Sequence, residues 1–382
     1  ESEKLENMRM QIIKVQLEEK VRTKGRRNFN TELKLSTTSG LKSWRDIIQP
    51  HPDVATGKFT QAEFAADLSK VYDGDASPEY GDAKKFFART FITGGMKSLL
   101  KQAKDRLCGG SGDPVVELKT NFGGGKTHSM LALFHLFGNS NWQDLNGIDQ
   151  LFPGENLQIN VKRAVLVGTS RGPMDILKIS DDITIKTTWG HMAYQIGESE
   201  GYNFLREADE TGIAPGSDKL GEFFKRFGPC LVLIDEWVAY LRQIYRVDNL
   251  PSGNFDSNLS FVQSLTEAVK ATPKTLLVAS LPASQVEVGG EGGAEALVRL
   301  EHTFARMHSS WQHATAEESY KIVRSRLFDD IPGENSADKE NTLRQFMRMY
   351  HDNSDSFPSN MTQGDKDYKN LLDICFPIHP SL

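Results

Sequence analysis

The sequence has few cysteines and no long apolar run, and each absence excludes a class of protein. Its three cysteines, Cys108, Cys230 and Cys375, are far apart and odd in number, which argues against a disulfide framework and against a CxxC metal or redox site. No apolar stretch approaches the roughly 18 residues that a membrane-spanning helix needs. The first residues, ESEKLENMRM, lack the basic and then apolar stretch of a secretory signal. We therefore expect a cytoplasmic protein with no membrane partner.

An excess of basic charge is also missing. The 382 residues include 45 lysines and arginines against 51 acidic residues, which gives a net charge of −6. No overall positive field is present to attract nucleic acid. One basic segment, Lys20 to Lys34, is either a solvated connector or a local contact to a phosphate backbone. Any DNA contact is thus expected to be local or to pass through partners.

Motifs for two common kinds of hydrolase are absent. The nine histidines form no HExxH, and none pairs with a cysteine at zinc-ligand spacing. No GxSxG motif marks a serine nucleophile. Neither zinc-dependent chemistry nor serine-hydrolase chemistry is therefore expected.

What the sequence does contain is an alternation of short apolar strands with helical segments. Strands are expected over residues 115–119, 164–169, 230–234 and 275–281, with helical segments between them. Such alternation predicts an α/β fold, a mostly parallel sheet with helices on both faces. Helices are also expected before the first strand and after residue 316.

A glycine-rich loop follows the first expected strand. The segment TNFGGGKTHS, Thr120 to Ser129, matches the P-loop pattern G-x-x-x-x-G-K-[ST] except that Thr120 replaces the leading glycine. Backbone N–H groups there and at the next helix start suit phosphates. Lys126 would reach the β- and γ-phosphates, and Thr127 would bind Mg²⁺. The alternative is a glycine turn with an incidental Lys-Thr. The predicted ATP-binding residues are Asn121, Phe122, Gly123, Gly124, Gly125, Lys126, Thr127 and His128.

A second motif, CLVLIDEWVAY, places two carboxylates at the end of an apolar strand. Ligands of open α/β sheets bind at the carboxyl ends of the strands. Asp235 is therefore expected to bind Mg²⁺, and Glu236 to orient and activate the attacking water. The alternative is an ordinary helix start with an acidic first turn.

Three further features follow the second motif. Ser280 ends the next strand, where it is either a sensor of the γ-phosphate or an ordinary strand-end serine. Arg299 and Arg306 are candidate arginine fingers, the alternative being surface ion pairs. Between Ser280 and Arg299, the glycines of EVGGEGG predict a flexible loop.

Several segments together resemble the prokaryotic ATPase family called domain of unknown function 499. They are WRDIIQPHPDV, QAEFAADL, TNFGGGKTHS, TTWGHMAYQIG, FGPCLVLIDEWVAY, LVASLPAS, EVGGEGG, EESYKIVRSRLF and the terminal PIHP. The resemblance runs from about Ser43 to the end of the sequence. It implies an AAA+-like P-loop ATPase of strand order 5-1-4-3-2, in which Thr120 is a family feature. Members are often encoded beside DNA methyltransferases and helicases in phage-defence gene clusters.

The resemblance also divides the chain and suggests how it works. It implies a helix and basic linker over residues 1–35, an ATPase core over 36–315 and the start of a helical lid over 316–382. The catalytic residues would be Lys126, Glu236, Ser280 and Arg306, with Arg306 acting in trans in a self-associated or defence-complex assembly. Alternatives are a non-hydrolysing ATP-dependent switch, a DNA translocase and a small-molecule kinase.

Overall fold

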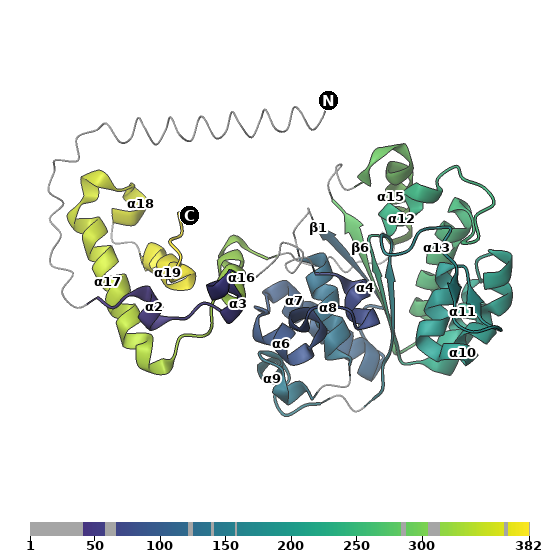
Figure 1. The fold of residues 1–382 in the computed structure, drawn as a ribbon, viewed down its shortest axis with the longest axis horizontal. Coiled ribbons are helices and arrows are strands. Elements are labelled where there is room, and N and C mark those ends of the chain that lie inside the picture. The colour runs from purple at the N-terminus through teal and green to yellow at the C-terminus, as the bar shows by residue number, and fades with distance from the viewer. Residues whose placement is uncertain are drawn as a thin grey trace. The chain divides into compact units, whose positions relative to one another are not determined.

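The structure is a computed structural model that describes residues 41–57, 66–120, 125–138, 141–156, 159–283, 288–304, 314–362 and 366–381 (Figure 1). It divides into two compact units. The sheet unit spans Pro50–Phe328, and the helical unit consists of Asp329–Leu382 and the segment that ends at Gln49. The helix and linker expected over 1–35 lie outside the described residues.

The sheet unit is built on a parallel sheet of four strands in the order β1-β6-β5-β2. All four strands lie at the expected places, so the α/β fold class is confirmed. Within the described ranges no strand pairs with the outer edge of β1. The strands are β1 (Val115–Thr120), β2 (Lys162–Val167), β5 (Cys230–Asp235) and β6 (Thr275–Pro282).

Helices cover both faces of this sheet because strand residues alternate between two hydrophobic cores. On β5, Cys230, Val232 and Ile234 belong to one core, while Leu231 and Leu233 belong to the other. All five side chains are at most 1% exposed, which explains why the central strand reads as a continuous apolar run.

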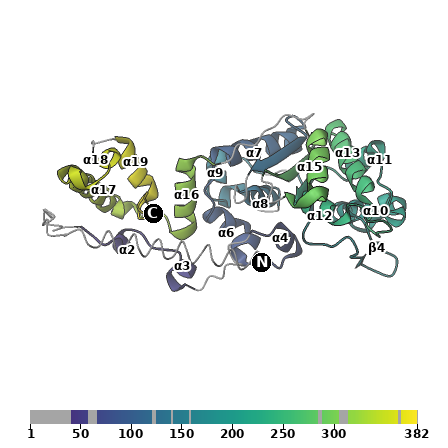
Figure 2. The ribbon, with the colours of Figure 1, turned by 90° about the horizontal axis from the view of Figure 1, so that it is seen from above.

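The first face packs against α4 (Leu68–Asp73), α5 (Pro78–Gly81), α6 (Ala83–Ala88), α7 (Gly94–Lys104), η2 (Asp105–Gly109), α8 (Lys126–Leu136), η3 (Trp142–Asp144) and α9 (Ile148–Leu151). The second packs against α10 (Thr188–Thr211), α11 (Ser217–Phe227), α12 (Trp237–Ile244), α13 (Phe255–Ala271) and α15 (Gly290–Phe304). Figure 2 shows α11, α13 and α15 side by side. An antiparallel hairpin, β3 (Leu177–Lys178) and β4 (Thr184–Ile185), joins β2 to α10 and was not predicted.

The EVGGEGG segment is more ordered than the sequence suggested. Gly290, Gly292 and Gly293 lie in the first turn of α15, which packs along α12. Glu291 of this turn forms an ion pair of 2.6 Å with Arg246. The expected flexible loop is therefore, from Gly290 onward, the start of a packed helix.

The two ends of the sheet unit meet. Pro50 and Phe328 form an antiparallel bridge, and the backbone N–H of His51 donates to Leu327 O at 3.0 Å. These ends lie beside α3 (Pro52–Thr56) and α16 (Ala316–Leu327). Helix α16 belongs to the sheet unit, where its Glu318 accepts a 2.6 Å hydrogen bond from the N–H of Gly94 at the start of α7.

The helical unit has no strand among its described residues. Asn335 donates to the carbonyl of Ile47 at 3.0 Å, which joins its N-terminal segment to its C-terminal one. The helices are α2 (Trp44–Ile47), α17 (Ser336–Asp352), α18 (Ser359–Thr362) and α19 (Lys366–Cys375), with short turns η4 (Gly333–Asn335) and η5 (Ser354–Ser356). Across the part of the chain that the structure describes, no helix is long and apolar enough to span a membrane.

Candidate functional site

The first part of the site is the connection from β1 to α8. Gly125 caps the start of α8 with a left-handed backbone, φ 80° and ψ 18°, which a glycine adopts without steric cost. Lys126 is the first helical residue, and its Nζ donates to the carbonyl oxygen of Thr120 at 2.9 Å. The intervening Asn121, Phe122, Gly123 and Gly124 lie outside the described residues. The Lys126 side chain therefore connects the end of the glycine loop to its beginning.

The second part is a buried carboxylate at the carboxyl end of β5. Asp235 is 3% exposed, and each of its oxygens accepts a hydroxyl hydrogen bond. Thr127 Oγ1 donates to Oδ2 at 2.7 Å, and Ser280 Oγ donates to Oδ1. The glycine-loop motif, the acidic motif and the end of β6 thus meet at one carboxylate.

Glu236 follows directly and has an unusual backbone. Its φ of 55° and ψ of 32° lie in the left-handed region, which is uncommon for a residue with a side chain. Its N–H donates to Asp235 Oδ1 at 3.1 Å and to Ser280 Oγ at 3.0 Å. These bonds satisfy the backbone at the turn into α12 and leave the Glu236 side chain exposed at the edge of the sheet.

Two residues at the end of β2 complete this turn, and the sequence analysis did not single them out. Thr169 Oγ1 donates to Glu236 Oε2. Gly168 faces the backbone of Glu236 so closely that an added Cβ would lie 2.2 Å from the Glu236 carbonyl oxygen. The sequence feature that could have pointed to them is a glycine followed by a hydroxyl residue at the end of a predicted strand. The implied strand order put these two strands side by side, but the sequence could not supply the register that brings Gly168 against Glu236.

His128, a predicted nucleotide-binding residue, has its Nε2 3.0 Å from Thr90 Oγ1. Its ring packs on Phe86 with centroids 4.6 Å apart. Burial, together with the positive charge of Arg326, lowers the pKa of His128 to about 4. The neutral ring therefore connects α8 to α6 through Phe86 and to the turn after α6 through Thr90.

Of the predicted site residues, the structure brings together Lys126, Thr127, Asp235, Glu236 and Ser280, with Gly125 at the start of α8. The candidate finger Arg306 lies outside the described residues. The other candidate, Arg299, forms ion pairs with Asp256 at 3.2 Å and with Glu295 at 2.7 Å. It therefore shows the surface pairing that was its alternative interpretation.

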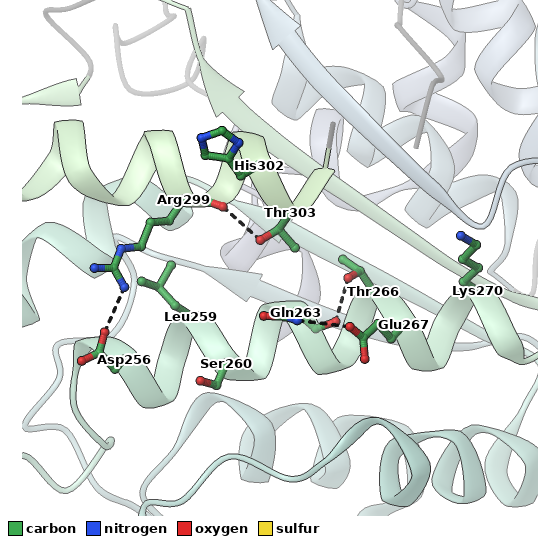
Figure 3. Close-up of a pocket in the computed structure, with 10 residues that line it drawn as sticks. All are labelled: Asp256, Leu259, Ser260, Gln263, Thr266, Glu267, Lys270, Arg299, His302 and Thr303. Atoms are coloured by element: carbon green, nitrogen blue, oxygen red, sulfur yellow. Dashed lines mark hydrogen bonds and ion pairs between the residues drawn. The ribbon is translucent and has the colours of Figure 1, made fainter. Parts of the chain in front are cut away.

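Arg299 also lines a surface groove between α13 and α15 (Figure 3). Most of its lining residues carry polar side chains, and none of them is one of the residues gathered around Asp235. They are Asp256, Leu259, Ser260, Gln263, Thr266, Glu267, Lys270, Arg299, His302 and Thr303. The groove is thus a feature separate from the candidate site.

The donor set around Asp235 suits a hard divalent cation. Thr127 and Asp235 offer hydroxyl and carboxylate oxygens, the ligand type that Mg²⁺ prefers, and Mg²⁺ usually keeps several waters and needs few protein ligands. No group of three or more His, Cys, Asp or Glu residues that could hold a metal is present within the described ranges. Thr127 and Asp235 are therefore the residues that would hold such a cation.

The fold and the site together define an α/β protein with a polar site at the carboxyl edge of a parallel sheet. The chain belongs to the DUF499 family, because residues 49–316 match the family's N-terminal domain. No curated protein and no solved structure matches the chain.

Proposed function

We propose that this chain binds ATP with Mg²⁺ and hydrolyses it, on a P-loop fold of the AAA+ type. The observation that carries the proposal is the 2.7 Å hydrogen bond from Thr127 to Asp235. It joins the residue after the loop lysine to the first carboxylate of the acidic motif. A P-loop ATPase needs these two groups together because both serve the same metal ion.

The strand order supports the same fold. Numbered in chain order, the strands β1, β2, β5 and β6 become 1 to 4, and the observed order reads 1-4-3-2. Among the described residues these four strands follow the 1-4-3-2 part of the expected order 5-1-4-3-2. The site lies where such sheets bind ligands, at the carboxyl ends of the strands.

Each residue has a distinct role in this proposal. The start of α8 and the ammonium of Lys126 bind the phosphates through positive charge. Thr127 and Asp235 would hold Mg²⁺, which neutralises charge on the β- and γ-phosphates when bound. Glu236 orients a water and accepts its proton as the water oxygen attacks the γ-phosphorus. The bond from that phosphorus to the bridging oxygen breaks, which releases ADP and phosphate.

The test measures ATP binding and phosphate release for the wild type, Lys126→Ala and Glu236→Gln at several protein concentrations. Lys126→Ala should weaken ATP binding about 10- to 100-fold, the effect of losing a charged hydrogen-bond donor. Glu236→Gln should keep ATP bound and slow hydrolysis by about 10²–10⁴-fold. Lys270→Ala and Glu267→Gln, at exposed positions on α13, are matched controls that should change neither quantity.

The alternatives give different results in the same assay. A non-hydrolysing switch would bind ATP but release no phosphate, and Glu236→Gln would change little. A DNA translocase would hydrolyse faster with added duplex, and the gain would fade steeply with salt. Failure of the wild type to bind ATP would overturn the proposal.

The partners follow from the resemblance and remain part of the proposal. An assembly for phage defence or DNA processing is the proposed setting, with any DNA bound through partners. In a self-associated form Arg306 would reach the site of a neighbouring subunit. Phosphate release that rises faster than linearly with protein concentration, and that is lost in Arg306→Ala, is the expected result.

A further inference from the structure

Ser280 lies beside both carboxylate residues because β6 is paired with β5. The parallel register places Ile234 opposite Ala279, so the next residues along each strand, Asp235 and Ser280, are also neighbours. Ser280 is 3% exposed. Its hydroxyl is therefore directed into the sheet edge and not into solvent.

The hydrogen bonds of this hydroxyl show what it can still bind. A serine hydroxyl has one proton to donate and two lone pairs to accept with. Its proton goes to Asp235 Oδ1, and one lone pair accepts the N–H of Glu236 at 3.0 Å. What remains is an acceptor, which a phosphate oxygen would repel. The observed bonds thus disfavour direct contact between Ser280 and a γ-phosphate.

The same bonds connect the metal-binding carboxylate to the catalytic one. Ser280 holds Oδ1 of Asp235, which leaves Oδ2 for Thr127. It also supports the N–H of Glu236, whose left-handed backbone needs such fixed partners. Without the hydroxyl, Oδ1 of Asp235 would keep one of its two hydrogen bonds, and the N–H of Glu236 would keep one partner instead of two.

We propose that Ser280 is a positioning residue that couples the orientation of Asp235, and hence metal binding, to the placement of Glu236. This inference rests on the proposed function and assigns Ser280 a role other than sensing the γ-phosphate. Groups that orient a metal ligand commonly change metal affinity by about 10- to 100-fold when they are removed.

The experiment compares the affinity of the full chain for ATP with Mn²⁺ and for ATP in a chelator, by calorimetry. Ser280→Ala should weaken binding of Mn²⁺-ATP about tenfold and leave metal-free ATP binding unchanged. Ser280→Thr, which keeps the hydroxyl, should restore most of the loss. Thr275→Val is the matched control on the same strand, because Thr275 Oγ1 is buried without a hydrogen-bond partner in the described structure.

Each other outcome contradicts the inference. Equal losses for ATP with and without metal, and none for ADP, would make Ser280 a phosphate sensor. Unchanged affinity in a Ser280→Ala chain that folds by circular dichroism would remove the positioning role while leaving the proposed function intact. No nucleotide binding by the wild type would overturn both.

Discussion

The hydroxyl of Thr127 donates a 2.7 Å hydrogen bond to Oδ2 of Asp235, across 108 positions of the sequence. Thr127 lies in the first turn of α8, and Asp235 is the last residue of β5. The two residues come within reach because β1 and β5 lie in one sheet, on either side of β6. It is therefore a contact that the fold makes and that local sequence cannot.

The first prediction concerns Asp235→Asn. A carboxylate only accepts hydrogen bonds, whereas an amide presents an NH₂ group to one of the hydroxyls of Thr127 and Ser280. The free energy of unfolding should fall by about 1–3 kcal/mol because of this mismatch. Binding of Mn²⁺-ATP should weaken by at least about tenfold. Urea denaturation and calorimetry measure the two effects.

Asp256→Asn provides the control for that substitution, because Asp256 is exposed on α13 and pairs with Arg299. It should alter stability by less than about 1 kcal/mol and leave nucleotide binding unchanged. Equal effects of the two substitutions would contradict the role given to Asp235.

The second prediction concerns Gly168→Ala. The added Cβ would lie 2.2 Å from the carbonyl oxygen of Glu236, so the turn between β5 and α12 must move. Overpacking of this kind costs about 1–3 kcal/mol. ATP binding should persist, because Lys126 and Thr127 lie on other elements, while phosphate release should fall severalfold or more through displacement of Glu236.

Gly216→Ala is the matched glycine control. An added Cβ there meets nothing within 4 Å, and the backbone φ of −71° suits alanine. Stability should change by less than about 1 kcal/mol, and phosphate release should stay within error of the wild type. If Gly168→Ala behaved in the same way, the close approach of Gly168 to Glu236 would not be needed for stability or for phosphate release.

The third prediction is a pH dependence of stability that arises from His128. Its pKa is about 4 in the folded chain and ordinarily 6.5, because burial disfavours the charged ring. Between these values the unfolded chain binds a proton that the folded chain does not. The stabilisation is thus present above pH 6.5 and is lost as the pH falls toward 4.

His128→Gln should therefore reduce the loss of unfolding free energy between pH 7 and pH 5 by about 2 kcal/mol. Urea denaturation at the two pH values gives this difference directly, whatever the variant's stability at pH 7. His302→Gln, at an exposed position on α15, should leave the pH dependence unchanged. A wild-type slope retained in His128→Gln would show that other groups cause it.

The central strands and the residues of the two motifs could be predicted from the sequence. The strand expected over 230–234 is β5 (Cys230–Asp235), and the helix expected to start after the glycine loop is α8. These elements are easy to recognise because buried parallel strands are continuously apolar and the glycine loop marks the start of a helix. Lys126, Thr127 and Asp235 followed from their positions at the ends of such elements.

What could not be predicted depends on the exact register and side-chain contacts between distant segments. Gly168 and Thr169 matter only because β2 lies against β5. Likewise, Gln195 bonds both the N–H and the carbonyl of Val165 at the edge of β2, at 2.7 and 3.0 Å. Gly168, Thr169 and Gln195 carry no local sequence pattern that shows which residue each of them contacts. Ser280 was predicted as a site residue, but its bonds to Asp235 and Glu236 appear only when β6 lies beside β5.

The bridge between Pro50 and Phe328 brings the first and last residues of the sheet unit together. Its entry and exit points adjoin, so a short peptide across them would close the unit into a ring without stretching its core. Units with adjacent ends tolerate circular permutation and transfer into other chains. New termini opened in a surface turn, with the old ones fused, should therefore give a chain that keeps the Thr127–Asp235 contact.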